Sequence, residues 1–264
     1  MAFDHILILA LIQGVTEFIP VSSSGHLTLA HGLTAFPDHG VTMDVALHLG
    51  TLIAVMVYFR RDVIGLLSGL VHVPLRRDTH EARQATHMIY ATVPVLIMAA
   101  VLLASGILDN LRTAHVVAWA SIVFAVPLYL ADRYGPQDKT EAHMRPQSAW
   151  LLGAAQMLAL IPGASRAGVT IMAGRAMGFS REAAARYSML MAMPVIASFA
   201  LVGLVELIDD GAWDALADAA LGALMAAVFA FISIDVFLRL TRRLSLSFFV
   251  AYRIALGVTI LAFF

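Results

Sequence analysis

The sequence contains no cysteine, which excludes disulfide bonds, cysteine-ligated zinc sites and thiol nucleophiles. It also has few charged residues, since Asp, Glu, Lys and Arg make up 13% of the chain, well below the roughly 25% that is usual in soluble domains. The formal net charge is -1, and no Lys- or Arg-rich tail is present. Without a basic surface the chain is not expected to bind nucleic acid.

What the sequence has in abundance is apolar residues. They make up 60% of its 264 residues and give a mean hydropathy of +0.84. This composition predicts a single integral membrane domain over residues 1–264, all-α and polytopic, with membrane lipids as its surroundings. Six stretches are long and apolar enough to be transmembrane helices: 41–59, 86–105, 115–131, 183–207, 216–238 and 246–263.

Two further apolar stretches are interrupted by polar residues. The first is interrupted at 13–26 by QGVTEFIPVSSSGH, between the apolar segments 3–19 and 27–33. The second is interrupted at 161–168 by IPGASRAG, between 148–161 and 168–177. A full span needs about 20 apolar residues, so each pair of short halves predicts a re-entrant helical hairpin. Both breaks contain an Ile-Pro pair, and we expect them to meet in space.

The distribution of Lys and Arg fixes the expected topology, because cytoplasmic loops are rich in these residues. With 60–83 placed inside, the loops 132–147, 175–186 and 239–243 also fall inside, and the inside loops then hold 14 of the 17 Lys and Arg residues. Three spans follow each hairpin. An odd number of spans per half predicts inverted-topology repeats, at about 1–131 and 148–264, joined by a cytoplasmic linker at 132–147.

The first break carries groups suited to acid–base chemistry. Gln13 and Glu17 are spaced i,i+4 and project from one helix face. Glu17 is a candidate general base, proton shuttle or cation ligand, since an ionisable residue inside a membrane is a functional-site hypothesis by default. Ser23 and His26, three positions apart, share a face if the following helix is regular. We also expect this break to contribute substrate-binding groups: Gln13, Ser22, Ser24 and Gly25.

The second break adds an anion site. Gly163 and Ser165 precede another expected helix start, and Arg166 supplies a planar, forked cation that suits phosphate. Thr170 lies about one turn further on. Two helix N-termini, an arginine, a carboxylate, an imidazole and several hydroxyls together suit phosphoryl transfer from a lipid-borne anion. For two other intramembrane charges, Asp235 and Arg253, we prefer a structural ion pair across two spans.

In combination, these motifs resemble those of the undecaprenyl-diphosphate phosphatase family, the bacitracin-resistance phosphatases of bacterial inner membranes. The resemblance covers the full chain. It rests on the Gln13–Glu17 pair, on PVSSSGH at 20–26 and on PGASRAGVT at 162–170.

The resemblance implies hydrolysis of undecaprenyl diphosphate to undecaprenyl phosphate and inorganic phosphate, which recycles the lipid carrier for peptidoglycan synthesis and confers bacitracin resistance. It also implies a multi-pass protein of the bacterial inner membrane, with inverted repeats and an active site facing the periplasm. A divalent cation, Mg²⁺ or Ca²⁺, is expected, with Glu17 as its ligand. By position, the functional residues of the family fall on Glu17, Ser22, Ser23, His26, Ser165, Arg166 and Thr170.

The chain departs from the family pattern at two positions. Gln13 stands where many members carry Glu, so this side chain cannot act as an acid or base. Ala167 replaces the serine that usually follows the arginine.

Three mechanisms stay open at the level of sequence: attack by Ser23, attack by His26, or attack by water that Glu17 and His26 activate. We favour Ser23 as nucleophile with His26 as its base and Arg166 holding the diphosphate. The main alternative function is a transporter or flippase of a lipid phosphate or another anion, because inverted repeats with broken helices are a transporter design. A homo-oligomer is compatible with the sequence, which does not set the oligomeric state.

Overall fold

The computed structural model describes residues 1–33, 40–210 and 216–264, and within these ranges every regular element is helical. A single bridge joins Lys139 and Phe179. The expectation of an all-α protein is therefore confirmed. The α-helices, in chain order, are α1 (Phe3–Thr16), α2 (Ser23–Leu33), α3 (Gly40–Tyr58), α4 (Arg60–His72), α5 (His80–Ser105), α6 (Ile107–Leu111), α7 (Ala114–Tyr134), α8 (Pro146–Met157), α9 (Arg166–Ala176), α10 (Arg181–Asp210), α11 (Leu216–Thr241) and α12 (Ser247–Phe263).

Five of these helices, α3, α5, α7, α10 and α11, are long and apolar enough to cross a membrane. The sixth expected span coincides with α12, which is apolar but has only 17 residues. At about 1.5 Å per residue α12 is about 25 Å long, slightly less than the ~30 Å hydrocarbon core of a bilayer. The protein is thus a multi-pass membrane protein.

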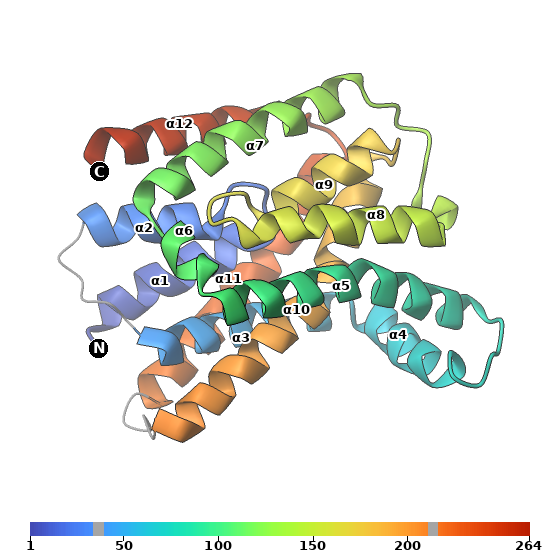
Figure 1. The fold of residues 1–264 in the computed structure, drawn as a ribbon, viewed down its shortest axis with the longest axis horizontal. Helices are drawn as coiled ribbons and strands as arrows, with labels where there is room; N and C mark the ends of the chain where they lie inside the picture. The colour runs from blue at the N-terminus through green and yellow to red at the C-terminus, as the bar shows by residue number, and fades with distance from the viewer. Residues whose placement is uncertain (34–39, 211–215) are drawn as a thin grey trace.

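Each of the two interrupted stretches forms a helical hairpin, and the two hairpins enter the bundle from opposite ends (Figure 1). The α1–α2 hairpin begins and ends at the side where both chain termini lie. The α8–α9 hairpin begins and ends at the other side. Their turns lie next to each other in the middle of the molecule, where the backbone N–H of Gly163 donates to Ser24 Oγ at 3.1 Å.

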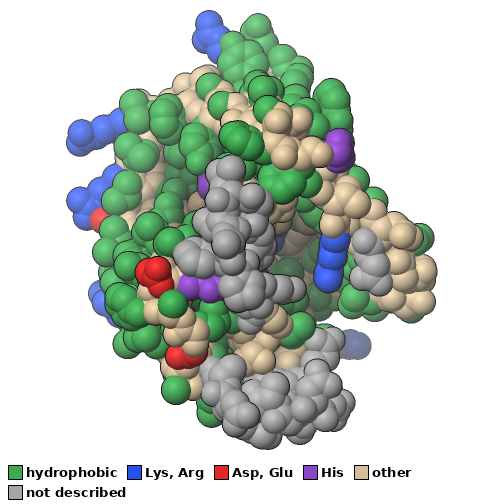
Figure 2. Space-filling model, turned by 90° about the vertical axis from the view of Figure 1, so that its left-hand side faces the viewer, with side chains coloured by type: hydrophobic (Ala, Val, Ile, Leu, Met, Phe, Trp, Pro, Cys, Tyr) green, Lys and Arg blue, Asp and Glu red, His purple; other side chains and the backbone are tan. Residues whose placement is uncertain are grey.

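Packing between the two halves is reciprocal. Helix α1 packs against α11 of the second half, and α8 packs against α5 of the first. Helix α3 packs against α10 and α7 against α12. Seen from the side where both termini lie, hydrophobic side chains predominate on the outer flanks of the molecule (Figure 2). This arrangement leaves the polar hairpin turns in the interior and turns apolar side chains outward, as lipid requires.

Helix α4 was not expected. Residues 60–72 belong to a segment that the sequence marks mainly by its arginines, but they form the amphipathic helix α4. Exposed Ile64, Leu67 and Val71 line its outer side. Its inner side packs tightly on α5, because a Cβ at Gly69 would lie 2.1 Å from the Glu81 carbonyl oxygen. Helix α5 in turn begins at His80, six residues before the expected span, because the Thr79 hydroxyl caps it.

Candidate functional site

The first polar group of the site lies at the end of α1. Gln13 is buried in the last turn, and its amide Nε2 donates to Glu17 Oε2 at 2.9 Å. The i,i+4 spacing therefore places both side chains on one face, as predicted. The other amide atom, Gln13 Oε1, is buried and has no hydrogen-bond partner in the described part of the chain. An unpaired buried carbonyl oxygen is costly, so this atom is a candidate ligand or acceptor.

Ser22 and Ser23, in the turn after Glu17, form different hydrogen bonds. Ser22 has a φ of 75°, a conformation that non-glycine residues rarely adopt. Its buried hydroxyl accepts a hydrogen bond from the Gly25 backbone N–H at 3.3 Å and so caps α2. Ser23 instead donates from Oγ to Glu17 Oε2 at 3.3 Å. Ser23 is therefore the serine of this turn whose hydroxyl contacts the carboxylate.

The second turn repeats the same device. Ser165 has a φ of 67°, and its hydroxyl accepts from the Gly168 N–H at 3.1 Å, capping α9. In conformation and hydrogen bonding its counterpart in the first turn is Ser22, although by distance from the proline it is Ser23. Strained backbone at the tip of both hairpins is a feature typical of functional sites.

An ion pair joins the two turns. Arg166 Nη2 donates to Glu17 Oε1 at 2.8 Å, and the two side chains are 12% and 9% exposed. Arg166 Nη1 also donates to the Ser188 carbonyl at 3.4 Å. Two residues 149 positions apart are thus held in contact inside an apolar bundle. Removing one partner of such a pair leaves an uncompensated buried charge.

A cavity of about 250 Å³ opens beside this ion pair. Both turns line it, together with side chains from α3, α8 and α10. The polar residues around it are Thr16, Glu17, Ser22, Ser23, Ser24, His48, Gln156, Ser165 and Arg166. The cavity therefore combines one cation, one carboxylate and several hydroxyls, which is a set that can bind and attack a phosphate group.

His26 is held outside this cavity. Its Nδ1 lies 2.8 Å from the Ser22 carbonyl oxygen, and its Nε2 lies 2.7 Å from the Tyr252 hydroxyl. The two rings also stack, with centroids 5.5 Å apart. Both ring nitrogens are thus engaged by groups other than Ser23. The structure does not bring Ser23 and His26 into the hydrogen-bonded contact that a nucleophile and its base require.

Thr170 points away from the cavity as well. Its hydroxyl donates to the Arg166 carbonyl at 2.8 Å and lies 2.7 Å from Ser188 Oγ, in a buried position. The Ser188 carbonyl also accepts a hydrogen bond from Arg166. Thr170 and Ser188 therefore hold the first turn of α9 in place on the side away from the cavity. Thr170 is placed to position Arg166 rather than to contact a substrate.

The preferred ion pair between Asp235 and Arg253 is wrong. Asp235 pairs with Arg239 at 2.8 Å on its own helix. Arg253 is fully buried and donates to the carbonyl oxygens of Gly163 and Ala164 at 3.1 and 2.9 Å. Carbonyl oxygens in a tight turn need donors, and the guanidinium offers several in one plane. Arg253 therefore shapes the second turn.

Four contributors to the site were missed or undervalued from the sequence: Tyr252, Ser188, Gln156 and His48. Each interrupts an apolar run, which is the signal that was available. Gln156 has a counterpart in the first half. It lies six residues before Pro162, and Gln13 lies seven residues before Pro20. Like Gln13 it is buried, and its Oε1 has no hydrogen-bond partner among the described residues.

Glycine is needed at position 163, and Gly163→Ala should destabilise the protein strongly. Gly163 has a φ of +92°, and an added Cβ would lie 2.2 Å from the Val117 carbonyl oxygen. We expect a loss of about 2 kcal/mol or more of stability, seen as a lower midpoint of thermal unfolding in detergent. Gly106→Ala is the matched control, because Gly106 has a φ of +69° but open space around it. Equal midpoints for the two variants would contradict the close contact.

Comparisons with known proteins agree with one another. The family model described as bacitracin resistance protein BacA matches residues 6–259. A protein of Maricaulis maris, named undecaprenyl-diphosphatase, is 44% identical over the whole of both chains. Proteins with the same name from a Ruegeria species and from Roseobacter denitrificans are 45% and 40% identical, over 99% and 100% of this chain and 98% and 99% of theirs.

Proposed function

The chain belongs to the bacitracin resistance protein BacA family, and from this membership and the site geometry we propose that it is an undecaprenyl-diphosphatase. It hydrolyses undecaprenyl diphosphate to undecaprenyl phosphate and inorganic phosphate, which returns the lipid carrier to peptidoglycan synthesis and supports bacitracin resistance. The observation that carries the proposal is the Glu17–Arg166 pair beside a cavity that Ser23 also lines. The relatives favour this function over an anion transporter, because each one reported above is named for a diphosphatase.

Arg166 is the proposed anchor of the diphosphate. A guanidinium can donate two parallel hydrogen bonds to phosphate oxygens, which fixes orientation as well as charge. The N-terminal ends of α2 and α9 meet at the same place and add the positive ends of their dipoles. Ser24, Gly163 and Ser165 complete the proposed binding surface around the cavity, and Ser22, Gly25 and Thr170 hold that surface in shape.

A divalent cation, Mg²⁺ or Ca²⁺, fits the donor set next to Glu17. The Glu17 carboxylate and the unpaired Gln13 Oε1 are neighbouring oxygen ligands of the kind that these ions prefer. No group of three or more His, Cys, Asp or Glu that could hold a metal occurs within 1–33, 40–210 and 216–264. Glu17 and Gln13 would hold such an ion, and when bound it would neutralise charge on the diphosphate.

Ser23 is the proposed nucleophile, with Glu17 in place of His26 as the group that accepts its proton. Ser23 Oγ already donates to Glu17 Oε2, whereas both nitrogens of His26 are engaged elsewhere. Attack forms a bond from Ser23 Oγ to the terminal phosphorus and breaks the bond to the bridging oxygen, releasing undecaprenyl phosphate. Water then hydrolyses the phosphoserine and releases inorganic phosphate. His26 has a positioning role through its bond to the Ser22 carbonyl.

The proposed topology has six transmembrane helices and two re-entrant hairpins, arranged as inverted repeats at about 1–131 and 148–264 with a cytoplasmic linker at 132–147. Three features support it: the opposite entry of the two hairpins, the reciprocal packing of the halves, and the concentration of Lys and Arg in loops at one end. In the bacterial inner membrane this topology directs the active site toward the periplasm.

Removing divalent cations should stop the reaction. We expect EDTA to abolish phosphate release from undecaprenyl diphosphate by purified protein in detergent, and Mg²⁺ or Ca²⁺ to restore it. Gln13→Glu adds a second carboxylate beside Glu17 and should lower the cation concentration needed for half-maximal rate by about tenfold. Full activity in EDTA would remove the cation from the proposal, and no release from folded protein in any cation would overturn the phosphatase itself.

A further inference from the structure

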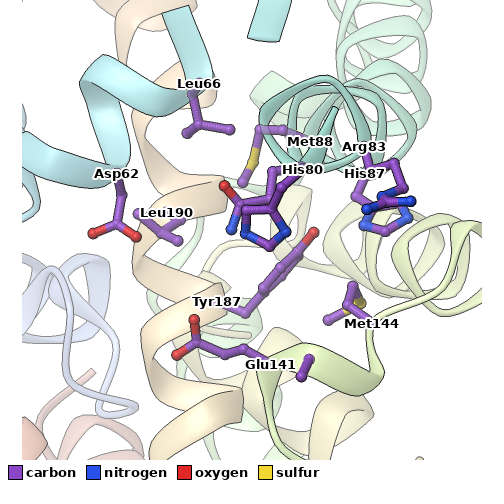
Figure 3. A pocket seen from close by; sticks show the side chains of 12 residues that line it. Asp62, Leu66, His80, Arg83, His87, Met88, Glu141, Met144, Tyr187 and Leu190 are labelled. Carbon is purple, nitrogen blue, oxygen red and sulfur yellow. The ribbon is translucent and has the colours of Figure 1, made fainter. Parts of the chain in front are cut away.

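A second cavity, of about 400 Å³, lies at the opposite end of the bundle from the chain termini. It is bounded by α4, α5, α10 and the short 3-10 helix η1 (Glu141–His143) in the linker. Figure 3 shows the side chains that line it. None of them belongs to the cavity beside Glu17 and Arg166, so this space has no part in the proposed hydrolysis.

The charges in this cavity are separated. Asp62 and Glu141 lie on one side, and Arg83 and His87 lie on the other (Figure 3). Arg186 pairs with both carboxylates, at 2.6 Å to Asp62 and 2.9 Å to Glu141. Burial raises the pKa of the Glu141 carboxyl above its usual range. The positive charge of Arg186 lowers this pKa, and the negative charge of Asp62 raises it again. Two carboxylates share one guanidinium here, so the acidic side keeps a negative charge that a further cation can neutralise.

The opposite side offers hydrogen-bond donors. Tyr187 is 8% exposed, and its hydroxyl has no partner within the described ranges. In Figure 3 that hydroxyl points into the cavity between His80 and the Arg83–His87 side. Arg83 pairs with Asp78 at 3.3 Å through an exposed contact that water screens. The cavity thus presents a buried donor without an acceptor next to an arginine and two imidazoles.

An apolar groove of about 340 Å³ continues from this cavity. The two spaces share Leu66, Met88 and Leu190. Every residue that lines the groove is apolar except Thr92, and the walls come from α4 and three membrane-crossing helices, α3, α5 and α10. A lipid whose hydrocarbon chain lies in this groove would therefore place its headgroup in the polar cavity.

We propose that cavity and groove together bind one phospholipid with a primary-amine headgroup, of the phosphatidylethanolamine type. The ammonium lies against Glu141 and Asp62, the phosphate accepts from Tyr187 Oη and Arg83, and an acyl chain fills the groove. A headgroup carrying only an anion would leave unmatched the negative charge of Asp62 and Glu141 that Arg186 does not balance. A choline headgroup carries the same charges but cannot donate a hydrogen bond to Glu141. The Lys- and Arg-rich loops at this end place the lipid in the cytoplasmic leaflet.

Lipid retention tests the proposal. Purified full-length protein is equilibrated with mixed micelles of equimolar phosphatidylethanolamine, phosphatidylglycerol and phosphatidylcholine, and bound lipid is counted by native mass spectrometry. We expect one retained phosphatidylethanolamine, favoured over phosphatidylcholine by about tenfold. Tyr187→Phe and Arg83→Gln should each reduce retention by about tenfold, Glu141→Gln should remove the preference over phosphatidylglycerol, and Ala197→Phe should block the groove.

The controls are Tyr134→Phe and Arg77→Gln, which remove an exposed hydroxyl and an exposed charge outside the cavity. Both should retain lipid as the parent protein does. Phosphate release by all variants should stay unchanged, so a failure of the proposed hydrolysis is seen independently of lipid binding. Equal retention of the three lipids, preference for phosphatidylglycerol, displacement by added undecaprenyl phosphate, or unchanged retention in both Tyr187→Phe and Ala197→Phe overturns the proposal.

Discussion

Replacing Arg166 by alanine should reduce phosphate release from undecaprenyl diphosphate by about 10³-fold or more. Among the residues that the structure describes, Arg166 is the one Lys or Arg that lines the cavity, and its partner Glu17 is buried beside it. Its loss removes the donors that stabilise charge on the transferring phosphoryl group, an effect worth about 10²–10³ for one donor in comparable sites. It also leaves Glu17 as an uncompensated buried carboxylate, which would repel the diphosphate.

Arg166→Lys separates charge from geometry. Lysine keeps the positive charge but cannot donate the paired hydrogen bonds of a guanidinium, so we expect it to recover only a small part of the lost rate. Arg242→Ala is the matched control, because Arg242 forms an exposed ion pair with Glu182 far from the cavity and should keep the parent rate. Unchanged thermal midpoints establish folding. A folded Arg166→Ala protein with near-parental turnover would remove Arg166 from the site.

The contact between the two breaks was predictable from the sequence. A carboxylate at Glu17 and an arginine at Arg166 cannot be buried separately in an apolar bundle without large cost, so a topology that brings the breaks together also predicts their pairing. The entry of the two hairpins from opposite ends was also predictable, because the distribution of Lys and Arg among the loops indicates which way each segment crosses the membrane. Both inferences depend on the cost of placing a charge in an apolar environment, which is several kcal/mol and therefore excludes most other arrangements of the chain.

The partners of His26 were not predictable. Spacing placed Ser23 and His26 on a shared helix face, but it could not reveal that Tyr252, 226 residues away, takes one ring nitrogen. Arg253 was misassigned for a similar reason, since backbone carbonyls of a distant turn are invisible in the sequence and competed successfully with Asp235. The partners of His26 and of Arg253 are set by hydrogen bonds worth about 1 kcal/mol net each, and these depend on local geometry.

The short amphipathic helix α4 shows a second limit. Its apolar residues are spaced for a helix, but the surrounding arginines indicate a loop equally well. Its stability comes from close packing against α5 at Gly69, a tertiary contact. The sequence therefore predicted the membrane-crossing part of the fold better than the helices at its ends, where hydrophobic length no longer decides the structure.

Replacing Ser23 by alanine should reduce hydrolysis by about 10⁴-fold, because it removes the hydroxyl that attacks the terminal phosphorus. Substrate binding should change little, since Arg166 and the helix ends remain. Ser198→Ala is the control, because the Ser198 hydroxyl donates to the Pro194 carbonyl of its own helix and does not line the cavity, so the rate should be kept. The measurement is single-turnover phosphate release, together with acid quenching of the parent enzyme to trap a phosphorylated protein.

Trapped phosphate should map to Ser23 and be missing in Ser23→Ala. Glu17→Gln should slow formation of the phosphoserine, because the amide cannot accept the proton of Ser23. His26→Ala should act more mildly, through the loss of its bonds to Ser22 and Tyr252. Phosphate trapped on His26, or a Ser23→Ala protein that is slowed less than about tenfold, would contradict attack by Ser23. Direct attack by water would then be the mechanism that fits a site with Glu17 as its base.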